Sequence, residues 1–555
     1  MKGFFQKNHH FIFYGLLLLL GILQAASTEL QDDEAYYWVY SHYPAWGYFD
    51  HPPLIAILIK AGYAIFPNGL GVRLFPLLLN IATLLIIEKL LVRKNPFLFY
   101  AIVLSIAVIQ IVGFLAIPDI PLLFFTALFF LWYRRFLNQA TFANTFLLGL
   151  VMALLMYSKY HGVLIILFTL LSNFSLLKKR QAWMAVAISI LLFLPHLWWQ
   201  YQHNWISIRY HLFESNTSAY KISYTLDYLW PQILLIGPLA GILLLPAAFL
   251  YKPKDETERA MHFTMIGVFV FFFVSSFKGK VEANWTLPAF VCIMVLSHQW
   301  LVENIRFQKW VKTFALLTTI VVMIGRIGMI KDILPIKAVK QRYHMWKDWP
   351  REMKEKLEGL PVVFNSSYQR ASKFWFYSGQ MTYSLNLYKE RENNYNYWPV
   401  EDSLLGKPVY ILDKYDLWRF ADSVKTPMGY VGYKYDSSFA SFAKVNIEVA
   451  PSEINCKAGD SLSVSYQFQI PTYYARFIEA AKNLQDTTRV GIFNSKGWVK
   501  DVYTSISLKQ AVQQPAGSLT WKPQLPPGVY YFLFAINNGA YYPTHNSRKI
   551  KLIIK

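Results

Sequence analysis

Two acidic motifs near the N-terminus contain side chains that could take part in proton transfer or ligand binding. Asp32, Asp33 and Glu34 are adjacent, and Asp50 is followed by His51 and two prolines. Adjacent carboxylates in an apolar setting need cations, a metal ion or water to stay charged. A carboxylate held next to a hydroxyl group can accept its proton, so these acids are candidates for a general base. A solvated loop is the alternative explanation, because short acidic runs are common on surfaces.

Three further polar segments interrupt apolar parts of the chain. They contain Asp119 in the first segment, Lys159 and His161 in the second, and Lys280, Glu282 and Asn284 in the third. Ionisable groups close to a membrane are costly and usually functional. A set of carboxylates beside a set of lysines suits the departure of a phosphate leaving group opposite an activated hydroxyl. For Asp119 and Lys159, a purely structural ion pair is the alternative.

The elements that position these motifs are apolar runs long enough to cross a membrane. Of the 555 residues, 55% are hydrophobic and 16% charged, whereas soluble proteins contain about 25% charged residues. A bilayer is spanned by about 20 apolar residues. About eleven runs predict an all-α polytopic membrane domain: residues 11–26, 73–92, 96–117, 121–137, 142–157, 162–177, 182–199, 228–250, 260–277, 285–302 and 311–330.

The basic residues predict the orientation of these spans. The formal net charge is +21, and five basic connectors fall on the same side as Lys2 and Lys7. By the positive-inside rule, that side and the N-terminus are cytoplasmic. All the candidate motifs and the chain after about residue 331 then lie on the external side. The excess charge fits membrane headgroups, and no separate basic domain indicates nucleic-acid binding.

The polar C-terminal part of the chain predicts two external modules after a membrane domain of residues 1–335. Residues 340–440 combine an amphipathic helix at 349–357 with short strands at 360–364 and 408–412, which is typical of an α/β module. Residues 441–555 alternate like strands separated by turn signals, which favours a β-sandwich. Its strands are expected at residues 442–449, 461–468, 488–493, 528–536 and 549–554.

The order of the polar motifs resembles that of the GT-C superfamily of membrane glycosyltransferases. The similar groups are the bacterial protein O-mannosyltransferase-like family and the lipid A aminoarabinose transferases. The resemblance extends over roughly residues 10–330 and rests on residues 33–37, 48–54, 118–122, 158–162 and 280–285. It implies a GT-C-like fold that transfers a sugar from a polyprenyl-phosphate-linked donor, on the external face of a bacterial inner membrane, to a lipid, glycan or protein acceptor.

The resemblance also implies roles for individual residues. Asp33 corresponds to the catalytic aspartate, Asp50 and Asp119 are expected to be catalytic with it, and Lys159 and Lys280 would contact the donor phosphate. The other expected substrate contacts are Glu34, His51, His161, Glu282 and Asn284. The Asp50-His51 pair replaces a Glu-Lys pair of the aminoarabinose transferases and is closer to the mannosyltransferase-like pattern. Whether a divalent metal ion binds near Asp50 is left open.

Two other classes of function are compatible with the composition. One is a transporter or flippase of lipid-linked sugars; transporters usually show paired repeats with broken helices at mid-membrane. Here the ionisable residues are expected in the first external loop (residues 27–72) and in the external connectors between later spans. This placement favours an enzyme. The other is a membrane-anchored binding protein that acts through its β-sandwich. The polar C-terminal part shows no group of residues that would form a binding site, so this class ranks last.

Overall fold

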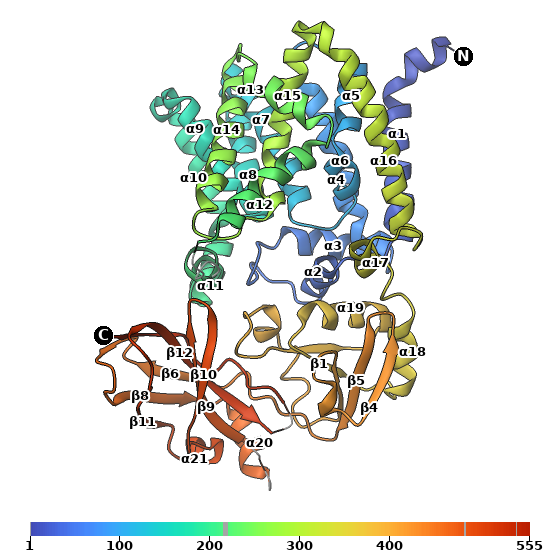
Figure 1. Ribbon diagram of the computed structural model, residues 1–555. Helices are drawn as coiled ribbons and strands as arrows, with labels where there is room; N and C mark the ends of the chain where they lie inside the picture. The colour runs from blue at the N-terminus through green and yellow to red at the C-terminus, as the bar shows by residue number, and fades with distance from the viewer. Residues whose placement is uncertain (1, 215–219, 482–483, 485, 540) are drawn as a thin grey trace. The chain divides into compact units, whose positions relative to one another are not determined.

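The computed structural model describes residues 2–214, 220–481, 484, 486–539 and 541–555 (Figure 1). The chain divides into two compact units, Met1–His344 and Met345–Lys555. The first unit is helical and contains the candidate site. The second is a mixed α/β unit with three sheets.

The first unit is built from seventeen α-helices among its described residues. They are α1 (Lys2–Ser27), α2 (Asp32–His42), α3 (Leu54–Ile65), α4 (Gly69–Leu90), α5 (Pro96–Ser105), α6 (Ala107–Val112), α7 (Asp119–Asn138), α8 (Phe142–Ser158), α9 (Gly162–Ser172), α10 (Arg180–Gln202), α11 (Ile206–Arg209), α12 (Ile222–Ile236), α13 (Gly241–Leu250), α14 (Glu256–Ser275), α15 (Pro288–Glu303), α16 (Gln308–Ile330) and α17 (Lys337–Tyr343). Short 3₁₀ turns precede α10, α15 and α16, at Phe174–Lys178, Ala283–Thr286 and Ile305–Phe307.

Six helical segments are long and apolar enough to cross a membrane, or seven if one bent pair is counted as a span. The pair is α12 and α13, which meet at 96° around a break that includes Gly237. Five shorter apolar helices add to them: α3, α5, α8, α9 and α15. The chain is therefore a multi-pass membrane protein.

Helices occupy each of the eleven apolar runs, but several runs are interrupted. Residues 96–117 form α5 and α6, which are separated at Ile106, and residues 162–177 form α9 and a 3₁₀ turn. The segment 27–72, expected as a polar loop, contains two helices, α2 and α3. Asp32, Asp33 and Glu34 form the first turn of α2, where negative charge is favourable for a helix.

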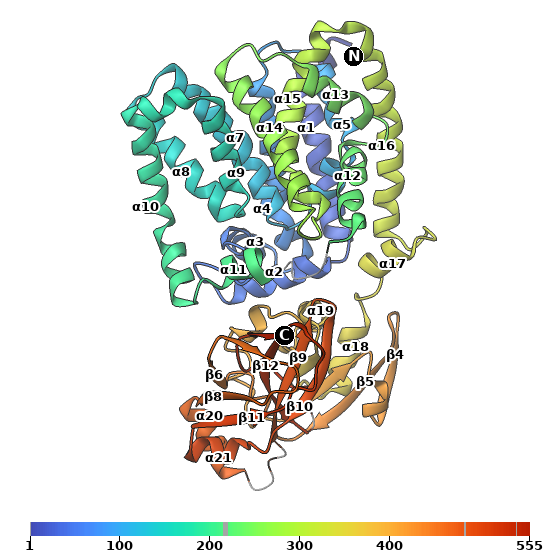
Figure 2. The ribbon, with the colours of Figure 1, turned by 60° about the vertical axis from the view of Figure 1, so that its left-hand side comes forward.

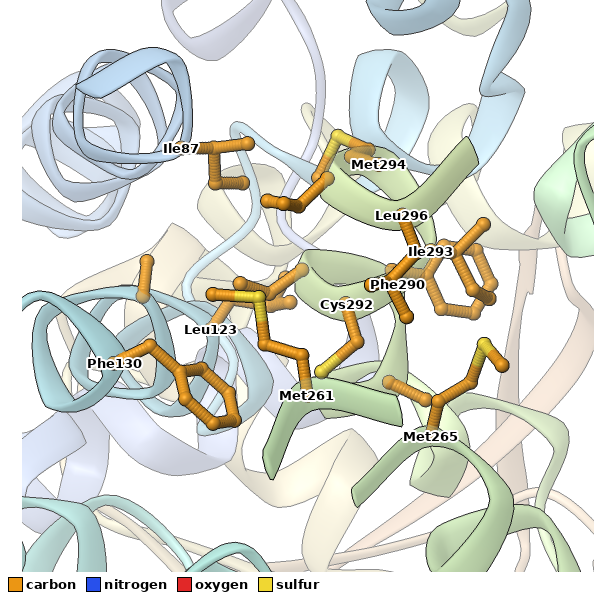
Figure 3. Packing of buried hydrophobic residues seen from close by; sticks show 14 of the residues in the cluster. Ile87, Leu123, Phe130, Met261, Met265, Phe290, Cys292, Ile293, Met294 and Leu296 are labelled. Atoms are coloured by element: carbon orange, nitrogen blue, oxygen red, sulfur yellow. The ribbon is translucent and has the colours of Figure 1, made fainter. Parts of the chain in front are cut away.

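Helix α15 runs through the centre of the first unit. Its residues from Pro288 to Gln299 are all buried, and it contacts α4, α5, α7, α13 and α14. Figure 3 shows Phe290, Cys292 and Met294 packed among side chains that include Ile87 of α4, Leu123 of α7 and Met261 of α14. Because α15 is enclosed, the 3₁₀ turn at its start, which contains Asn284, is fixed against the ends of its neighbours.

The second unit contains thirteen strands in three sheets among its described residues. The strands are β1 (Val362–Asn365), β2 (Thr382–Leu385), β3 (Val409–Asp413), β4 (Asp422–Thr426), β5 (Gly429–Asp436), β6 (Asn446–Ala450), β7 (Glu453–Cys456), β8 (Leu462–Gln469), β9 (Asp486–Asn494), β10 (Gly497–Tyr503), β11 (Ala516–Trp521), β12 (Gly528–Asn538) and β13 (Ile550–Ile554). The helices are α18 (Trp349–Lys356), α19 (Tyr368–Ser378), α20 (Thr472–Ala480) and α21 (Leu508–Gln513).

The first sheet has the strand order β2-β1-β3-β5-β4, and β1 is parallel to both of its neighbours. The other sheets have the orders β10-β9-β12-β13-β7 and β11-β8-β6 (Figure 2). These two sheets share one apolar core, to which Val464 of β8, Ile492 of β9 and Phe534 of β12 contribute. The alternation of buried and exposed residues along β8 reflects this one-sided packing.

Buried polar contacts join the α/β part of this unit to the two-sheet part. Glu401 is fully buried and accepts hydrogen bonds from the hydroxyls of Ser441 and Tyr474 and from the Ala443 amide. Burial raises the pKa of Glu401 above its usual range. The neighbouring Lys444 donates to the carbonyls of Asn396 and Trp398, and burial lowers its pKa.

Candidate active site

Asp119, Lys159 and Asn284 meet in a buried polar cluster. The Lys159 Nζ atom lies 2.8 Å from Asp119 Oδ1, and Asn284 Nδ2 donates to Asp119 Oδ2 at 3.1 Å. Asp119 begins α7, Lys159 immediately follows α8, and Asn284 precedes α15. Three segments far apart in the sequence therefore bring a carboxylate, an ammonium and an amide to the same end of the helical unit.

His161 lies beside this cluster and faces aromatic rings. Its ring centre lies 5.0 Å from that of Phe272 and 5.2 Å from that of Trp285. The Nδ1 atom is buried and has no hydrogen-bond partner among the described residues. His161 is also close enough to Lys159 and His211 for electrostatic interaction.

Asp50 is buried next to two tyrosines of α2. The hydroxyls of Tyr36 and Tyr40 lie 3.3 and 3.4 Å from Asp50 Oδ2, and His211 contacts the Asp50 carbonyl oxygen at 3.0 Å. His51 is half-buried, with its ring 5.5 Å from that of Tyr37. The motif at residues 48–54 thus lies against the helix that begins with the acidic motif.

Tyr160 connects the Asp50 segment with the Lys159 cluster. Its ring lies 5.9 Å from that of His211, and it lies within electrostatic range of Asp50. Gln200 Nε2 donates to the Tyr160 hydroxyl and to Ser207 Oγ, each at 2.8 Å. Ser207 in turn donates to the Tyr48 carbonyl at 2.8 Å.

Sequence reasoning missed Tyr36, Tyr40, Gln200 and His211 as members of this site. The two tyrosines are spaced four residues apart, which places them on one face of a helix. That spacing is visible in the sequence, but residues 27–72 are expected to form a loop. No spacing relates His211 to Asp50 or Gln200 to Tyr160, because these residues meet only through the fold.

Glu34 is placed differently from its acidic neighbour Asp33. Glu34 and Arg73 are both fully buried, and Arg73 binds both carboxylate oxygens, at 2.7 and 2.6 Å. Arg73 also donates to the carbonyls of Ala25, Thr28 and Glu29, at the end of α1 and just beyond it. Glu34 accepts from the amide of Ala116 as well. It therefore fixes the starts of α2 and α7, while Asp33 is exposed.

Lys280 and Glu282 form an exposed ion pair of 2.8 Å in the connector that also contains Asn284. The hydrogen bond to Glu282 raises the pKa of Lys280. An exposed pair of this kind is worth less than about 1 kcal/mol. Lys280 can therefore exchange Glu282 for an anionic ligand at little cost.

Among the described residues, no three His, Cys, Asp or Glu side chains come close enough together to hold a metal ion. The surroundings of Asp50 include two tyrosine hydroxyls and a contact of its carbonyl oxygen with His211.

Comparison with known proteins is consistent with this geometry. The family model described as dolichyl-phosphate-mannose-protein mannosyltransferase matches residues 50–199. The lipid A galacturonosyltransferase RgtD of Rhizobium johnstonii is 25% identical over 327 residues, which cover 55% of this chain and 68% of RgtD.

Solved structures of ArnT from Cupriavidus metallidurans share the fold. The apo structure has a TM-score of 0.57 at 11% identity and covers 77% of this chain and 98% of ArnT. The structure bound to undecaprenyl phosphate has a TM-score of 0.55 at 12% identity and covers 76% and 97%. Residues 50–199 are thus similar to the dolichyl-phosphate-mannose-protein mannosyltransferases, more than half of the chain is similar to a lipid A galacturonosyltransferase, and the chain shares the fold of ArnT.

Proposed function

We propose that the protein transfers a sugar from a polyprenyl-phosphate-linked donor to a lipid acceptor on the external face of a bacterial inner membrane. The observation that carries the proposal is the Asp119–Lys159–Asn284 cluster, which is connected to Asp50 through Tyr160 and His211. The undecaprenyl phosphate bound by ArnT and the lipid A named for RgtD support the donor and acceptor classes. The proposed topology keeps eleven spans and an external second unit, as the basic connectors predict.

In the proposed reaction, an acceptor hydroxyl attacks the anomeric carbon of the donor sugar. The bond from that carbon to the phosphate oxygen breaks, and polyprenyl phosphate leaves. Asp33, exposed on the first turn of α2, accepts the hydroxyl proton. Asp50 and Asp119 orient the acceptor and hold the cationic groups in place.

Lys159 and Lys280 stabilise the charge that develops on the leaving phosphate. An ammonium has three hydrogen-bond donors, and among the described residues Lys159 has one acceptor, Asp119 Oδ1 at 2.8 Å. Two donors therefore remain for phosphate oxygens. Lys280, in the same connector as Asn284, guides the phosphate toward Lys159, because Asn284 reaches Asp119, the partner of Lys159. His161 lies close enough to Lys159 for electrostatic interaction.

An apolar groove supports a donor with a long hydrocarbon chain. It has a volume of about 560 Å³ and is lined by α12, α13 and α14, with Trp230, Phe249 and Phe273 among its residues. Gln232, also in its wall, donates to the carbonyl of Ala283 next to Asn284. The groove thus reaches the connector to which the phosphate is assigned.

Mass spectrometry of lipid-linked sugars and surface glycolipids in a deletion strain tests this proposal. We expect a polyprenyl-phosphate sugar to accumulate while a glycolipid lacks one sugar residue. Loss of the external lipid-linked sugar itself, with no accumulation, would instead show that the protein moves the donor across the membrane.

A further inference from the structure

A second polar site lies at one edge of the first sheet of the second unit, where β1 and β3 end. These two strands are adjacent and parallel. The chain leaving β1 passes through α19 to β2, while the chain leaving β3 turns to the opposite side, toward β5 and β4 (Figure 1). In open α/β sheets, ligands bind in the crevice at such a reversal of strand order.

The last residues of the two strands form a buried polar pair. Asn365 ends β1 and Asp413 ends β3, and Asn365 Nδ2 donates to Asp413 Oδ2 at 3.0 Å. Asp413 also accepts from the Tyr415 amide at 2.8 Å. The Tyr542 hydroxyl, which donates to Asp416, lies 3.1 Å from Asp413 Oδ2. Asn365 Oδ1 is buried and has no hydrogen-bond partner among the described residues. It is an acceptor that a ligand hydroxyl can satisfy.

Two arginines flank this pair, and neither forms an ion pair within the described part of the chain. Arg370, in the first turn of α19, lies 4.5 Å above the Tyr415 ring and hydrogen-bonds to its hydroxyl. Arg419 lies 4.7 Å above the Tyr542 ring and 5.4 Å from the Trp418 ring. Both guanidinium groups are half-buried. Stacking on the rings holds them in place while their edges keep N–H donors for an anion.

The aromatic residues of the same loop are unusually exposed. Trp418 is 80% and Tyr415 is 73% exposed. Large apolar rings held at a surface beside buried polar groups are typical of binding sites rather than of packing. The site therefore offers a flat apolar surface, fixed guanidinium donors and a recessed acceptor for hydroxyl groups.

We propose that this edge of the sheet binds a phosphorylated sugar, separately from the membrane-embedded active site. The guanidinium fork matches the phosphate oxygens, the exposed rings cover the apolar face of the sugar, and Asn365 and Asp413 bind its hydroxyls. An anionic membrane surface would also attract Arg370, Arg419 and Trp418. It would make no use of the buried Asn365–Asp413 pair, which therefore favours the sugar.

Binding of glucose 1-phosphate to the full-length protein in detergent tests the proposal, with glucose as the uncharged probe. In a saturation-transfer NMR experiment, we expect a signal from bound glucose 1-phosphate and an at least about tenfold weaker signal from glucose. Arg419→Ala should weaken glucose 1-phosphate binding by about tenfold, the effect of losing a hydrogen bond to a charged group. Trp418→Ala should weaken it by about the same factor, because the apolar face of the sugar loses the ring that covers it. The matched controls Arg548→Ala and Tyr435→Ala remove exposed residues elsewhere in the unit and should bind as the wild type does.

Three outcomes separate the sources of the ligand from failure of the proposal. Weaker use of a phosphorylated glycolipid acceptor by Arg419→Ala, seen as a higher KM at unchanged kcat, would make that headgroup the ligand. An unchanged KM with loss of glucose 1-phosphate binding would make a free sugar phosphate the ligand. Glucose 1-phosphate binding that is unchanged in both Arg419→Ala and Trp418→Ala would overturn the proposal. Phosphatidylglycerol vesicles without any sugar that bind the wild type and the two variants equally well would overturn it too.

Discussion

At the scale of single residues, the question is whether Lys159 acts on the donor or only pairs with Asp119. Its ammonium is buried but uses one donor on Asp119 Oδ1. A contact to phosphate in both the ground and the transition state lowers donor binding and turnover together when it is removed. Lys159→Ala should therefore weaken both by about 10- to 100-fold.

The measurement is donor binding and single-turnover transfer with purified, folded variants. Lys60→Ala serves as the matched control, since Lys60 is an exposed lysine of α3. If Lys159 only joins the ends of α7 and α8, Lys159→Ala would lose thermal stability while its folded fraction bound the donor normally.

At the scale of elements, the Glu34–Arg73 pair sets the positions of α1, α2, α4 and the turn before α7. Removing one partner of a buried pair leaves an uncompensated charge and costs about 3–5 kcal/mol. We expect Arg73→Met to lower the melting temperature strongly and the double variant Arg73→Met with Glu34→Leu to recover part of that loss. Lys340→Ala, which breaks the exposed pair with Asp332, should leave the melting temperature nearly unchanged. A double variant no more stable than the single one would contradict this role.

The sequence allowed the element types to be predicted more securely than their contacts. Strands expected at residues 461–468 and 528–536 are observed at Leu462–Gln469 and Gly528–Asn538, because period-two alternation records one-sided burial. The apolar runs likewise become helices. What could not be predicted was that Glu34 pairs with Arg73, or that His211 reaches Asp50. Neither contact leaves a spacing pattern, since each depends on how distant segments pack.

The second unit contains a buried acid that should make its stability depend on pH. Burial raises the pKa of Glu401, so the folded state favours the protonated form. The resulting stability is fully present below the unfolded pKa of about 4.3 and is lost as the pH rises from there through the raised folded pKa. Glu401→Gln should therefore gain stability relative to the wild type across that interval. Hydrogen exchange of the full chain at several pH values measures the stability of the second unit in the variant and the wild type. A stability difference between the two that does not change with pH would contradict this role of Glu401.

At the scale of the whole molecule, the proposal requires a particular orientation in the membrane. Reporters fused after Arg135 or Arg180 should be cytoplasmic, because basic connectors are retained on that side. A reporter fused after Lys340 should be external. The second unit begins at Met345. A reporter after Lys340 that proves cytoplasmic would therefore place the second unit and the proposed donor phosphate on the cytoplasmic side, which contradicts the proposal.

In the proposed function, this chain breaks the bond between a sugar and polyprenyl phosphate and transfers the sugar to a lipid. The most direct test uses purified protein in vesicles, a labelled undecaprenyl-phosphate sugar and a glycolipid acceptor, followed by mass spectrometry. We predict equimolar release of undecaprenyl phosphate and gain of one sugar by the acceptor, slowed by about 10²–10⁴-fold in Asp33→Asn. Intact donor on the opposite leaflet with no acceptor product, or normal transfer by folded Asp33→Asn, would contradict the account.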